Sequence, residues 1–340
     1  MELLLITGAG ASRNLGRDVP MPLMSDWSDA LCHALDERES NLASACHLTP
    51  GMQGPEFEKN LGLLLRWQQI RHLEERFQDL GGPQAGSHLG EVVKSRNRTG
   101  RRLEAVMETI NITLYDQFGQ RQVDDEKAMA SYRALLRALG DPRVMLATTN
   151  YDRVGESALA GLGMDVDAGF RAQPERTPRL EPAGLIEERG EKTPVIHLHG
   201  AVGWYEQEDG SVGQYHADQR FNSSLGTPVV LYPDPDKDPT SDATVSELWT
   251  AFSAALEAAE AVMVVGHSLH DPALVRALRR LGKSKPLVIT YFAEEDKTRV
   301  ERLVPGAWAV QMDFGPEMEI EEPVGDFLKT FKRPARIHVN

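Results

Sequence analysis

Short apolar runs that alternate with helical patterns are the feature of this chain that most constrains its fold. Seven such runs have the length and composition of strands buried on both faces of a sheet. The runs are Leu3–Thr7, Arg143–Thr148, Pro194–Leu198, Pro228–Leu231, Ala261–Val265, Pro286–Tyr291 and Trp308–Met312. Patterns with helical spacing lie at Met129–Leu139, Ser246–Ala259, Pro272–Leu281 and Glu294–Leu303. This alternation predicts an α/β fold, with a Rossmann-like parallel sheet and helices on both of its faces.

One segment, from about residue 50 to residue 122, interrupts the alternation. Amphipathic runs at Phe57–Leu80 and Arg101–Phe118 predict helices, with no convincing strand between them. The stretch Gly81–Ser87 divides the two runs and has the composition of a linker. We therefore predict a helical subdomain inserted into the sheet domain.

The other boundaries follow from composition. We predict a single domain over residues 1–330, because 340 residues with 41% hydrophobic content can bury one large core. Residues 171–192 are rich in Pro, Arg and Glu, which favours an irregular excursion on the surface. Residues 331–340 are basic and are expected to form a tail.

The composition also limits the partners and the compartment. The net charge of −14, from 51 acidic and 37 basic residues, argues against direct binding of nucleic acid. Two cysteines, Cys32 and Cys46, are too few for a thiolate zinc site or a disulfide framework. The chain begins without a basic signal-peptide region, and no stretch reaches the length of a membrane span. We expect a cytoplasmic protein without a membrane partner.

The first apolar run ends in a turn of small residues, Gly8-Ala9-Gly10-Ala11-Ser12. Such a turn lets backbone N–H groups converge on a phosphate at a helix N-terminus. The third glycine of the dinucleotide fingerprint is replaced by Arg13, so the dehydrogenase pattern is absent. A turn without a ligand is an alternative, because glycine also serves tight turns for structural reasons.

Polar residues follow three later runs at the points where apolar packing stops. The blocks are Thr148-Thr149-Asn150-Tyr151-Asp152, His197-Leu198-His199-Gly200 and Gly266-His267-Ser268-Leu269-His270-Asp271-Pro272. Ligands of open α/β sheets bind at the carboxyl ends of the strands. We therefore expect the three blocks and the glycine turn to form one site.

Taken in order, the four blocks resemble the sirtuin family. Sirtuins read Gly-Ala-Gly-x-Ser-x-x-x-Gly, then Thr-x-Asn-x-Asp, then His-Gly, then Gly-x-Ser-Leu. The matching residues are Gly8, Ala9, Gly10, Ser12 and Gly16, then Thr148, Asn150 and Asp152, then His199 and Gly200, then Gly266, Ser268 and Leu269. The resemblance extends from residue 8 to about residue 290, and the ordered set is more specific than any single block.

Two departures separate this chain from the sirtuin deacylases. After Gly16 those enzymes show Ile-Pro-Asp-Phe-Arg, whereas Val19-Pro20 is followed here by Met21-Pro22-Leu23. The deacylases also hold a structural zinc with two Cys-x-x-Cys pairs, and this sequence has none. The chain is therefore more similar to the sirtuin-like NAD-hydrolysing effectors of bacterial anti-phage systems. That resemblance implies an NAD+ glycohydrolase that releases nicotinamide and ADP-ribose and causes abortive infection by NAD depletion.

The resemblance also implies a role for each site residue. Asn150 would orient the attacking water or ribose, Asp152 would contact the nicotinamide amide, and His199 would be the general base. Gly8, Gly10, Ala11 and Ser12 would cradle the pyrophosphate, and Ser268 would bond a phosphate or the adenosine ribose. The full set of expected contacts to NAD, the substrate, is Gly8, Ala9, Gly10, Ala11, Ser12, Thr149, Gly266, Ser268 and Leu269. No metal is expected.

Several of these residues also have a structural interpretation. Asn150 is typical of a turn that bonds its own backbone, while Asp152 and Ser12 are typical helix caps. A histidine at a strand end, such as His199, is often a core group with satisfied hydrogen bonds. His267 and His270 are expected at the surface or behind the ligand contacts, and the effect of Tyr151 on the nicotinamide pocket is open.

Three rival functions remain at this point. A metal-dependent hydrolase would use His197 and His199, which are two apart on a strand, with Asp152 or Asp271 as a further ligand. A module that senses NAD or ADP-ribose without cleaving it would need Gly8, Gly10 and Ser268 but neither Asn150 nor His199. A protein deacylase is the third, and the missing cysteines count against it.

Uncontrolled NAD hydrolysis would kill the host, so we expect the protein to be inactive until infection. Because the α/β pattern continues close to residue 340, we expect no fused sensor domain. Activation is therefore expected from self-assembly into a homo-oligomer or from a separate protein. The resemblance implies an ATP-driven DNA translocase or an Argonaute-like protein, with residues 50–122 as the contact surface.

Overall fold

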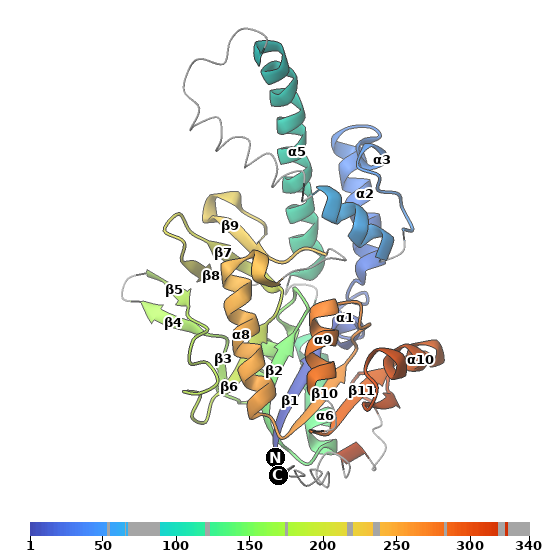
Figure 1. The fold of residues 1–340 in the computed structure, drawn as a ribbon, viewed down its shortest axis with the longest axis vertical. Coiled ribbons are helices and arrows are strands. Elements are labelled where there is room, and N and C mark those ends of the chain that lie inside the picture. The colour runs from blue at the N-terminus through green and yellow to red at the C-terminus, as the bar shows by residue number, and fades with distance from the viewer. Residues whose placement is uncertain are drawn as a thin grey trace, which may run out of the picture. The chain divides into compact units, whose positions relative to one another are not determined.

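The computed structural model divides into two compact units, which we describe separately. The first comprises Met1–Leu23, Phe118–Leu231 and Asp236–Asn340, and the second comprises Met24–Gln117 and Tyr232–Pro235. The structure describes residues 1–52, 55–64, 66, 89–119, 123–173, 176–215, 220–233, 239–281, 284–318 and 324–325. The predicted linker at 81–87 and the tail at 331–340 lie outside these residues. Figure 1 labels the elements of both units.

A seven-stranded sheet forms the centre of the first unit, in the order β12-β11-β10-β1-β2-β6-β3. Its strands are β1 (Glu2–Thr7), β2 (Arg143–Thr148), β3 (Val166–Asp167), β6 (Thr193–His197), β10 (Ala261–Val265), β11 (Leu287–Tyr291) and β12 (Trp308–Gln311). All neighbouring strands are parallel. Ile6 pairs with Val264 on one side and with Ala147 on the other, so β1 is a central strand. The predicted parallel sheet is confirmed.

Helices cover both faces of this sheet. They are α1 (Ala9–Arg13), α6 (Asp125–Ala138), α7 (Val154–Gly161), α8 (Ala243–Ala258), α9 (Pro272–Leu281) and α10 (Glu294–Leu303). Because side chains alternate along a strand, Leu4 and Ile6 enter one core, with α8, α9 and α10. Leu3 and Leu5 enter the other core, with α1, α6 and α7. Full burial of one such side chain contributes about 1.5–3 kcal/mol.

A second sheet of five strands lies in the same unit, in the order β4-β5-β8-β7-β9. Its strands are β4 (Phe170–Gln173), β5 (Arg176–Leu180), β7 (Gly200–Glu206), β8 (Val212–Gln214) and β9 (Thr227–Val230). Single-turn helices lie at Ser223–Leu225 and Pro239–Ser241. The ladders are antiparallel. Only Leu198 and His199 separate the end of β6 from the start of β7, so His199 lies at the junction of the two sheets.

Two expectations from the sequence are corrected by this second sheet. The run Pro228–Leu231 was expected in the parallel sheet, but β9 pairs antiparallel with β7. A four-residue apolar run has no periodicity that distinguishes the two kinds of sheet. The segment 171–192 was expected to be irregular, which holds for residues 181–192, where turns and coil are found. Before them, β4 and β5 form an antiparallel pair in which Phe170 faces Leu180. Their polar composition hides these strands from a search for apolar runs.

Among the described residues of the second unit, helices joined by turns are the regular secondary structure. Its helices are α2 (Met24–Arg38), α3 (Leu42–Ala45), a helical stretch at 55–64 and α5 (Leu89–Phe118), which reaches the first unit at Phe118. Trp27 of α2 packs edge-on against Phe57 at 5.4 Å between ring centroids and donates to Thr113 Oγ1 at 3.1 Å. The helical unit therefore begins at Met24, earlier than residue 50. No described helix, α5 included, is long and apolar enough to cross a membrane.

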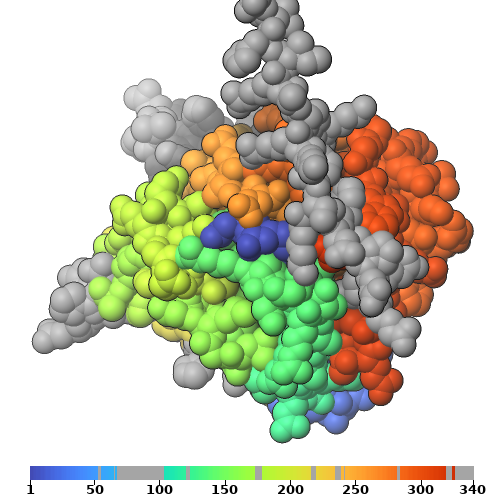
Figure 2. All heavy atoms as spheres, turned by 90° about the horizontal axis from the view of Figure 1, so that it is seen from below, coloured from blue at the N-terminus to red at the C-terminus, as the bar shows by residue number. Residues whose placement is uncertain are grey.

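The amino ends of the central strands carry paired charges. Glu2 accepts from Arg143 at 3.3 Å and from Arg189 at 2.6 Å, and its N–H donates to Glu260 at 3.0 Å. Figure 2 shows this face, with the start of the chain in blue between segments coloured green and orange. These charges lie at the edge of the sheet opposite to the polar blocks.

Candidate functional site

The four polar blocks of the sequence meet at the carboxyl ends of adjacent strands. In the sheet β10, β1, β2 and β6 are neighbours in that order, and each is followed by one block. Backbone bonds join the loops. The N–H of Thr149 donates to Thr7 at 3.1 Å, and the N–H of Leu198 donates to Thr148 at 2.8 Å. The glycine turn and the three polar blocks therefore lie along one edge of the sheet, as expected from the sequence.

The glycine turn after β1 packs directly against the loop after β10. The N–H of Gly10 donates to the carbonyl of Gly266 at 2.8 Å, and the N–H of Gly8 donates to Val265 at 3.0 Å. A Cβ atom added to Gly8 or Gly10 would lie 2.8 or 2.9 Å from the Gly266 oxygen. Gly266 itself has a φ of +63°, and a Cβ there would lie 2.1 Å from the nitrogen of Ala11. The glycines are thus needed for close backbone approach.

This packing changes the expected role of the turn. The N–H groups of Gly8 and Gly10 are used by the neighbouring loop, and that of Ala11 donates to Gly8 at 2.9 Å. They therefore bond within the protein in this structure, instead of forming an open cradle for a pyrophosphate. Contact of these residues with NAD stays a proposal.

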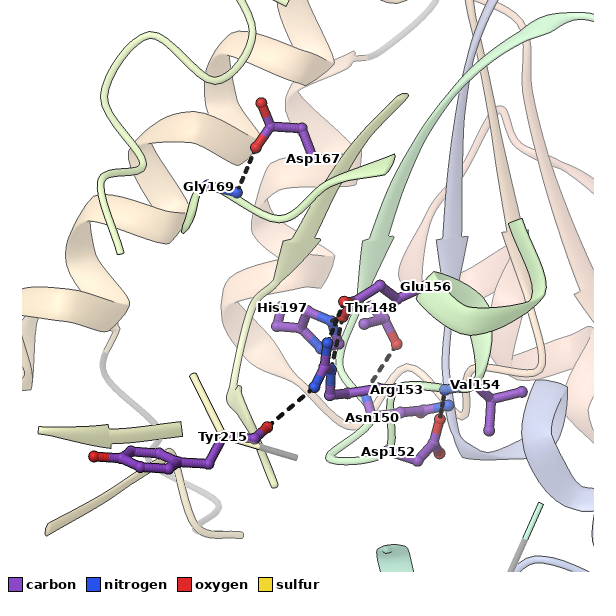
Figure 3. Close-up of polar contacts among 10 residues, drawn as sticks. All are labelled: Thr148, Asn150, Asp152, Arg153, Val154, Glu156, Asp167, Gly169, His197 and Tyr215. Carbon is purple, nitrogen blue, oxygen red and sulfur yellow. Dashed lines mark hydrogen bonds and ion pairs between the residues drawn. The ribbon is translucent and has the colours of Figure 1, made fainter. Parts of the chain in front are cut away.

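Asn150 connects the loop after β2 to the glycine turn. Its Nδ2 donates to the carbonyl of Gly8 at 3.1 Å and to Ser12 Oγ at 3.0 Å. Its N–H donates to Thr148 Oγ1 at 3.1 Å (Figure 3). Its side-chain oxygen accepts no hydrogen bond from the described residues. The amide is therefore fixed through its nitrogen, and its oxygen keeps an acceptor for a ligand or water.

Asp152 is a buried carboxyl group two residues further along. Its Oδ1 accepts from the N–H of Val154, the first residue of α7, at 3.0 Å. Burial raises the pKa of Asp152, while hydrogen bonds from Val154 and Ser12 and the charge of His197 oppose the shift. Ser12 thus contacts both Asn150 and Asp152, and the three side chains form one polar chain.

His199 is paired with a carboxylate that the sequence-based assignment of roles did not include. Its Nε2 lies 2.8 Å from Oδ2 of Asp271, and both side chains are buried. The ring of Tyr151 lies 6.4 Å from that of His199, and the Tyr151 hydroxyl donates to Leu231 at 2.9 Å. Sequence reasoning considered Asp271 only as a metal ligand.

A group of partly buried charged side chains, with the buried His197, lies beside the site. Arg153 Nε donates to Glu156 Oε2 at 2.9 Å, its Nη2 contacts Oε1, and His197 Nε2 lies 3.3 Å from Oε2 (Figure 3). Burial acts to raise the pKa of Glu156, but hydrogen bonds and charge from Arg153 and His197 lower it to about 2. His197 Nδ1 is buried without a hydrogen-bond partner among the described residues. The pattern of the sequence did not reveal this group.

The remaining predicted contacts differ in accessibility. Ala9 and Thr149 are half-buried, and Ser268 is exposed on the loop after β10. Leu269 packs into the core with a φ of +58°, so its side chain is turned into the protein. His267 is half-buried and accepts from the N–H of Leu269 at 2.8 Å, while His270 is exposed. The structure therefore brings Ser268 to the surface and Leu269 into the interior.

The two histidines of the metal-hydrolase alternative contact different carboxylates. His197 faces Glu156 and His199 faces Asp271. Within the described part of the chain, no group of three histidine, cysteine, aspartate or glutamate side chains is placed to hold a metal ion. The geometry therefore gives that alternative no support.

A cavity of about 730 Å³ lies beside this edge. It is lined by Asn14, Gly16, Arg17, Asp18, Val19, Pro20, Lys127, Asp313, Gly315, Pro316, Glu317 and Met318. None of the predicted site residues lines it, and its charged groups carry both signs. The cavity therefore does not mark the polar site.

Comparison with known proteins gives one family match. Residues 144–308 match the model of a family described as a SIR2-like domain. The matched range contains Asn150, Asp152, His199 and Ser268, whereas the glycine turn lies outside it. A search of curated proteins finds no match.

Similar solved structures are distant. A mutant Sir2 homologue in complex with 2′-O-acetyl-ADP-ribose has 14% identity and a TM-score of 0.43, covering 100% of this chain and 95% of its own. A structure described as the basis for the mechanism and regulation of Sir2 enzymes has 12% identity and a TM-score of 0.39, covering 96% and 89%. A mutant Sir2 homologue in complex with ADP-ribose has 12% identity and a TM-score of 0.39, covering 96% and 90%. These likenesses are too distant to assign a role to a residue.

Proposed function

We propose that this chain, whose residues 144–308 match a SIR2-like domain, hydrolyses NAD+ to nicotinamide and ADP-ribose. One observation carries the proposal. Asn150, Ser12 and Asp152 form a connected polar chain over β1 and β2, and His199 follows the adjacent strand β6. This group supplies an amide, a carboxyl and an imidazole at the edge where ligands of parallel sheets bind.

The chemistry needs a held ribose, a positioned water and little bulk water. The bond between ribose C1′ and the nicotinamide nitrogen breaks, and its electron pair leaves with nicotinamide. Water adds to the oxocarbenium-like carbon and loses a proton to His199, which acts as general base. The side-chain oxygen of Asn150 orients the water or a ribose hydroxyl, and Asp152 contacts the nicotinamide amide.

The proposed contacts with the rest of NAD come from the loops after β1, β2 and β10. Ala9, Thr149 and Ser268 have side chains at least partly accessible. Leu269 would contact NAD through its backbone, because its side chain is in the core. The engaged N–H groups of Gly8, Gly10 and Ala11 would need to share their hydrogen bonds with a phosphate.

We propose further that NAD hydrolysis serves antiviral defence by depleting NAD in an infected cell. An enzyme of this kind needs control, which an activating partner or a homo-oligomer would supply. A DNA-translocating ATPase or an Argonaute-like protein is the partner class that fits the family resemblance. The proposal requires no metal, no membrane and no direct contact with nucleic acid, and it places the protein in the cytoplasm.

A sensing module that binds NAD or ADP-ribose without cleaving it is the second candidate. One observation favours it. Asn150, Asp152 and His199 are only 8%, 4% and 3% exposed, so this conformation is closed to a substrate at those side chains. A closed site also suits an enzyme that awaits activation.

Turnover separates the two candidates. We expect purified protein, alone or with the products of neighbouring genes, to convert NAD+ to nicotinamide and ADP-ribose, measured by chromatography. Asn150→Ala and His199→Ala are expected to abolish both products. Matched controls are Asn222→Ala, at a surface turn, and His33→Ala, at an exposed pair with Glu37. NAD+ that binds without cleavage under every condition would favour the sensing module.

A further inference from the structure

Asp271 is a buried carboxylate to which the proposed chemistry gives no role. It lies between β10 and α9 and is 5% exposed. Its Oδ1 accepts from the N–H of Ala273 at 2.8 Å and of Leu274 at 3.0 Å, in the first turn of α9. Its Oδ2 lies 2.8 Å from Nε2 of His199. Both oxygens are therefore used, each toward a different element.

The pair connects two loops that are distant in the sheet. His199 follows β6 and Asp271 follows β10, and the order β10-β1-β2-β6 places β1 and β2 between them. Three strand spacings correspond to about 14 Å. The pair therefore reaches across the carboxyl ends of β1 and β2, where the glycine turn and Asn150 follow.

Capping of α9 alone does not account for this arrangement. Asp242 caps α8 through one oxygen, which accepts from Val245 at 2.8 Å, and Asp124 caps α6 in the same way toward Lys127 at 3.0 Å. Asp271 also completes its capping with a single oxygen. The second oxygen of Asp271 contacts the imidazole of His199, and helix capping does not require this contact.

We propose that Asp271 is the positioning residue of His199. An ionised carboxylate only accepts hydrogen bonds, so the pair places the imidazole proton on Nε2 and leaves Nδ1 as the nitrogen that takes up a proton. This inference rests on the proposed function. In the hydrolysis, the proton of the attacking water or ribose hydroxyl moves to Nδ1, while Nε2–H stays bonded to Asp271. The carboxylate remains ionised and stabilises the imidazolium, as in other histidine–carboxylate pairs.

Two variants test the proposal. Asp271→Asn keeps an oxygen for the N–H groups of α9 but presents an NH₂ group to His199, so the ring is expected to move its proton to Nδ1. Asp242→Asn makes the same change at the cap of α8 and is the matched control. Nitrogen spectra of ¹⁵N-histidine protein, with His199 assigned from the His199→Ala spectrum, report the tautomer without reference to activity.

We expect a proton on Nε2 of His199 in the wild type and in Asp242→Asn, and on Nδ1 in Asp271→Asn. In NAD+ cleavage we expect Asp271→Asn to lower kcat by about 100-fold or more with little change in KM, and to alter the pH profile of kcat. Asp242→Asn should leave kcat, KM and the pH profile of kcat unchanged.

The contrary results are distinct. A wild-type His199 with its proton on Nδ1 would overturn the proposal even if Asp271→Asn failed to fold. So would an Asp271→Asn protein whose kcat equals that of Asp242→Asn. If the wild type cleaves no NAD+, the proposed function fails, and the tautomer of His199 alone then tests the role of Asp271. A tautomer that is the same in Asp271→Asn as in the wild type would overturn that role. A shift of the proton to Nδ1 in Asp271→Asn would support it.

Discussion

The two ends of the same parallel strands use polar residues in opposite ways. At the amino ends Glu2 forms one ion pair with the exposed Arg143 and a second, partly buried pair with Arg189. At the carboxyl ends Asn150, Asp152 and His199 are buried, and each is bonded to a residue of a different loop or helix. Surface pairs are solvated and stabilise a fold weakly, whereas buried polar groups cost free energy unless their partners are exact in geometry. The carboxyl edge is therefore the part of the sheet built for something other than stability.

The carboxyl edge should tolerate substitution poorly, and Gly266 should show the largest effect. In Gly266→Ala the new Cβ meets the nitrogen of Ala11 at 2.1 Å in addition to the strain of a positive φ. We expect the free energy of unfolding to fall by about 3 kcal/mol or more, measured with denaturant. Gly210→Ala is the control, since its φ is +75° and no atom lies within 4 Å of the added Cβ. It should lose about 1–2 kcal/mol, and equal losses would disprove the close approach.

The partly buried Glu156 is expected to make stability depend on acid pH. Its folded pKa of about 2 lies below the ordinary value of 4.5, so its stabilisation is complete above pH 4.5 and is lost as the pH falls toward 2. We expect Glu156→Gln to cost a few kcal/mol at pH 7 and to remove this dependence. Asp152 acts in the opposite sense, because its raised pKa lowers stability as the pH rises above its ordinary value. Unfolding curves of Glu156→Gln and Asp152→Asn between pH 3 and 8 should therefore diverge from the wild type in opposite directions.

Asn150→Ala should have a moderate effect on stability and a complete effect on activity. The substitution removes the donors to the carbonyl of Gly8 and to Ser12. The Gly8 carbonyl keeps its bond from the N–H of Ala11, so the cost is that of two lost buried hydrogen bonds. We expect a loss of about 1–3 kcal/mol in total, which calorimetry or denaturant unfolding would measure. A variant as stable as the wild type would show that the bonds across the edge contribute little.

The amino edge should give the smallest effect. Glu2→Gln weakens the pairs with Arg143 and Arg189. We expect a loss below about 1 kcal/mol that disappears in high salt, with NAD+ cleavage unchanged. A loss as large as that of Glu156→Gln would remove the contrast between the two edges.

Much of the sheet was predictable from the sequence, because its strands are short apolar runs between helical patterns. The run Ala261–Val265 became a central parallel strand, buried on both faces. The antiparallel sheet was not predictable in the same way, since Arg176–Leu180 is polar and Thr227–Val230 is too short to show a period. The pattern of apolar residues along a short segment indicates which residues are buried. Which sheet a short strand joins depends on pairing with strands that are distant in the sequence.

The sequence predicted which polar residues follow the ends of β1, β2, β6 and β10, but not the contacts that they make. The order of the blocks predicted that Asn150 lies near the glycine turn, and its Nδ2 donates to Gly8 and Ser12. The partner of His199, Asp271, lies 72 residues away, and no spacing in the sequence indicates that pair. The glycines of the turn were expected to approach a phosphate, whereas the structure shows them approaching Gly266. A glycine indicates that the backbone approaches another group closely, but the sequence does not show whether that group is a ligand or another loop.

The most direct test of this account is the rate of NAD+ cleavage in a carboxyl-edge variant and an amino-edge variant under identical conditions. Asn150→Ala and Glu2→Gln would be assayed by chromatography of nicotinamide and ADP-ribose, alone and with the products of neighbouring genes. We expect no product from Asn150→Ala and the wild-type rate from Glu2→Gln. Cleavage that survives in Asn150→Ala, or NAD+ that the wild type binds but never cleaves, would contradict it.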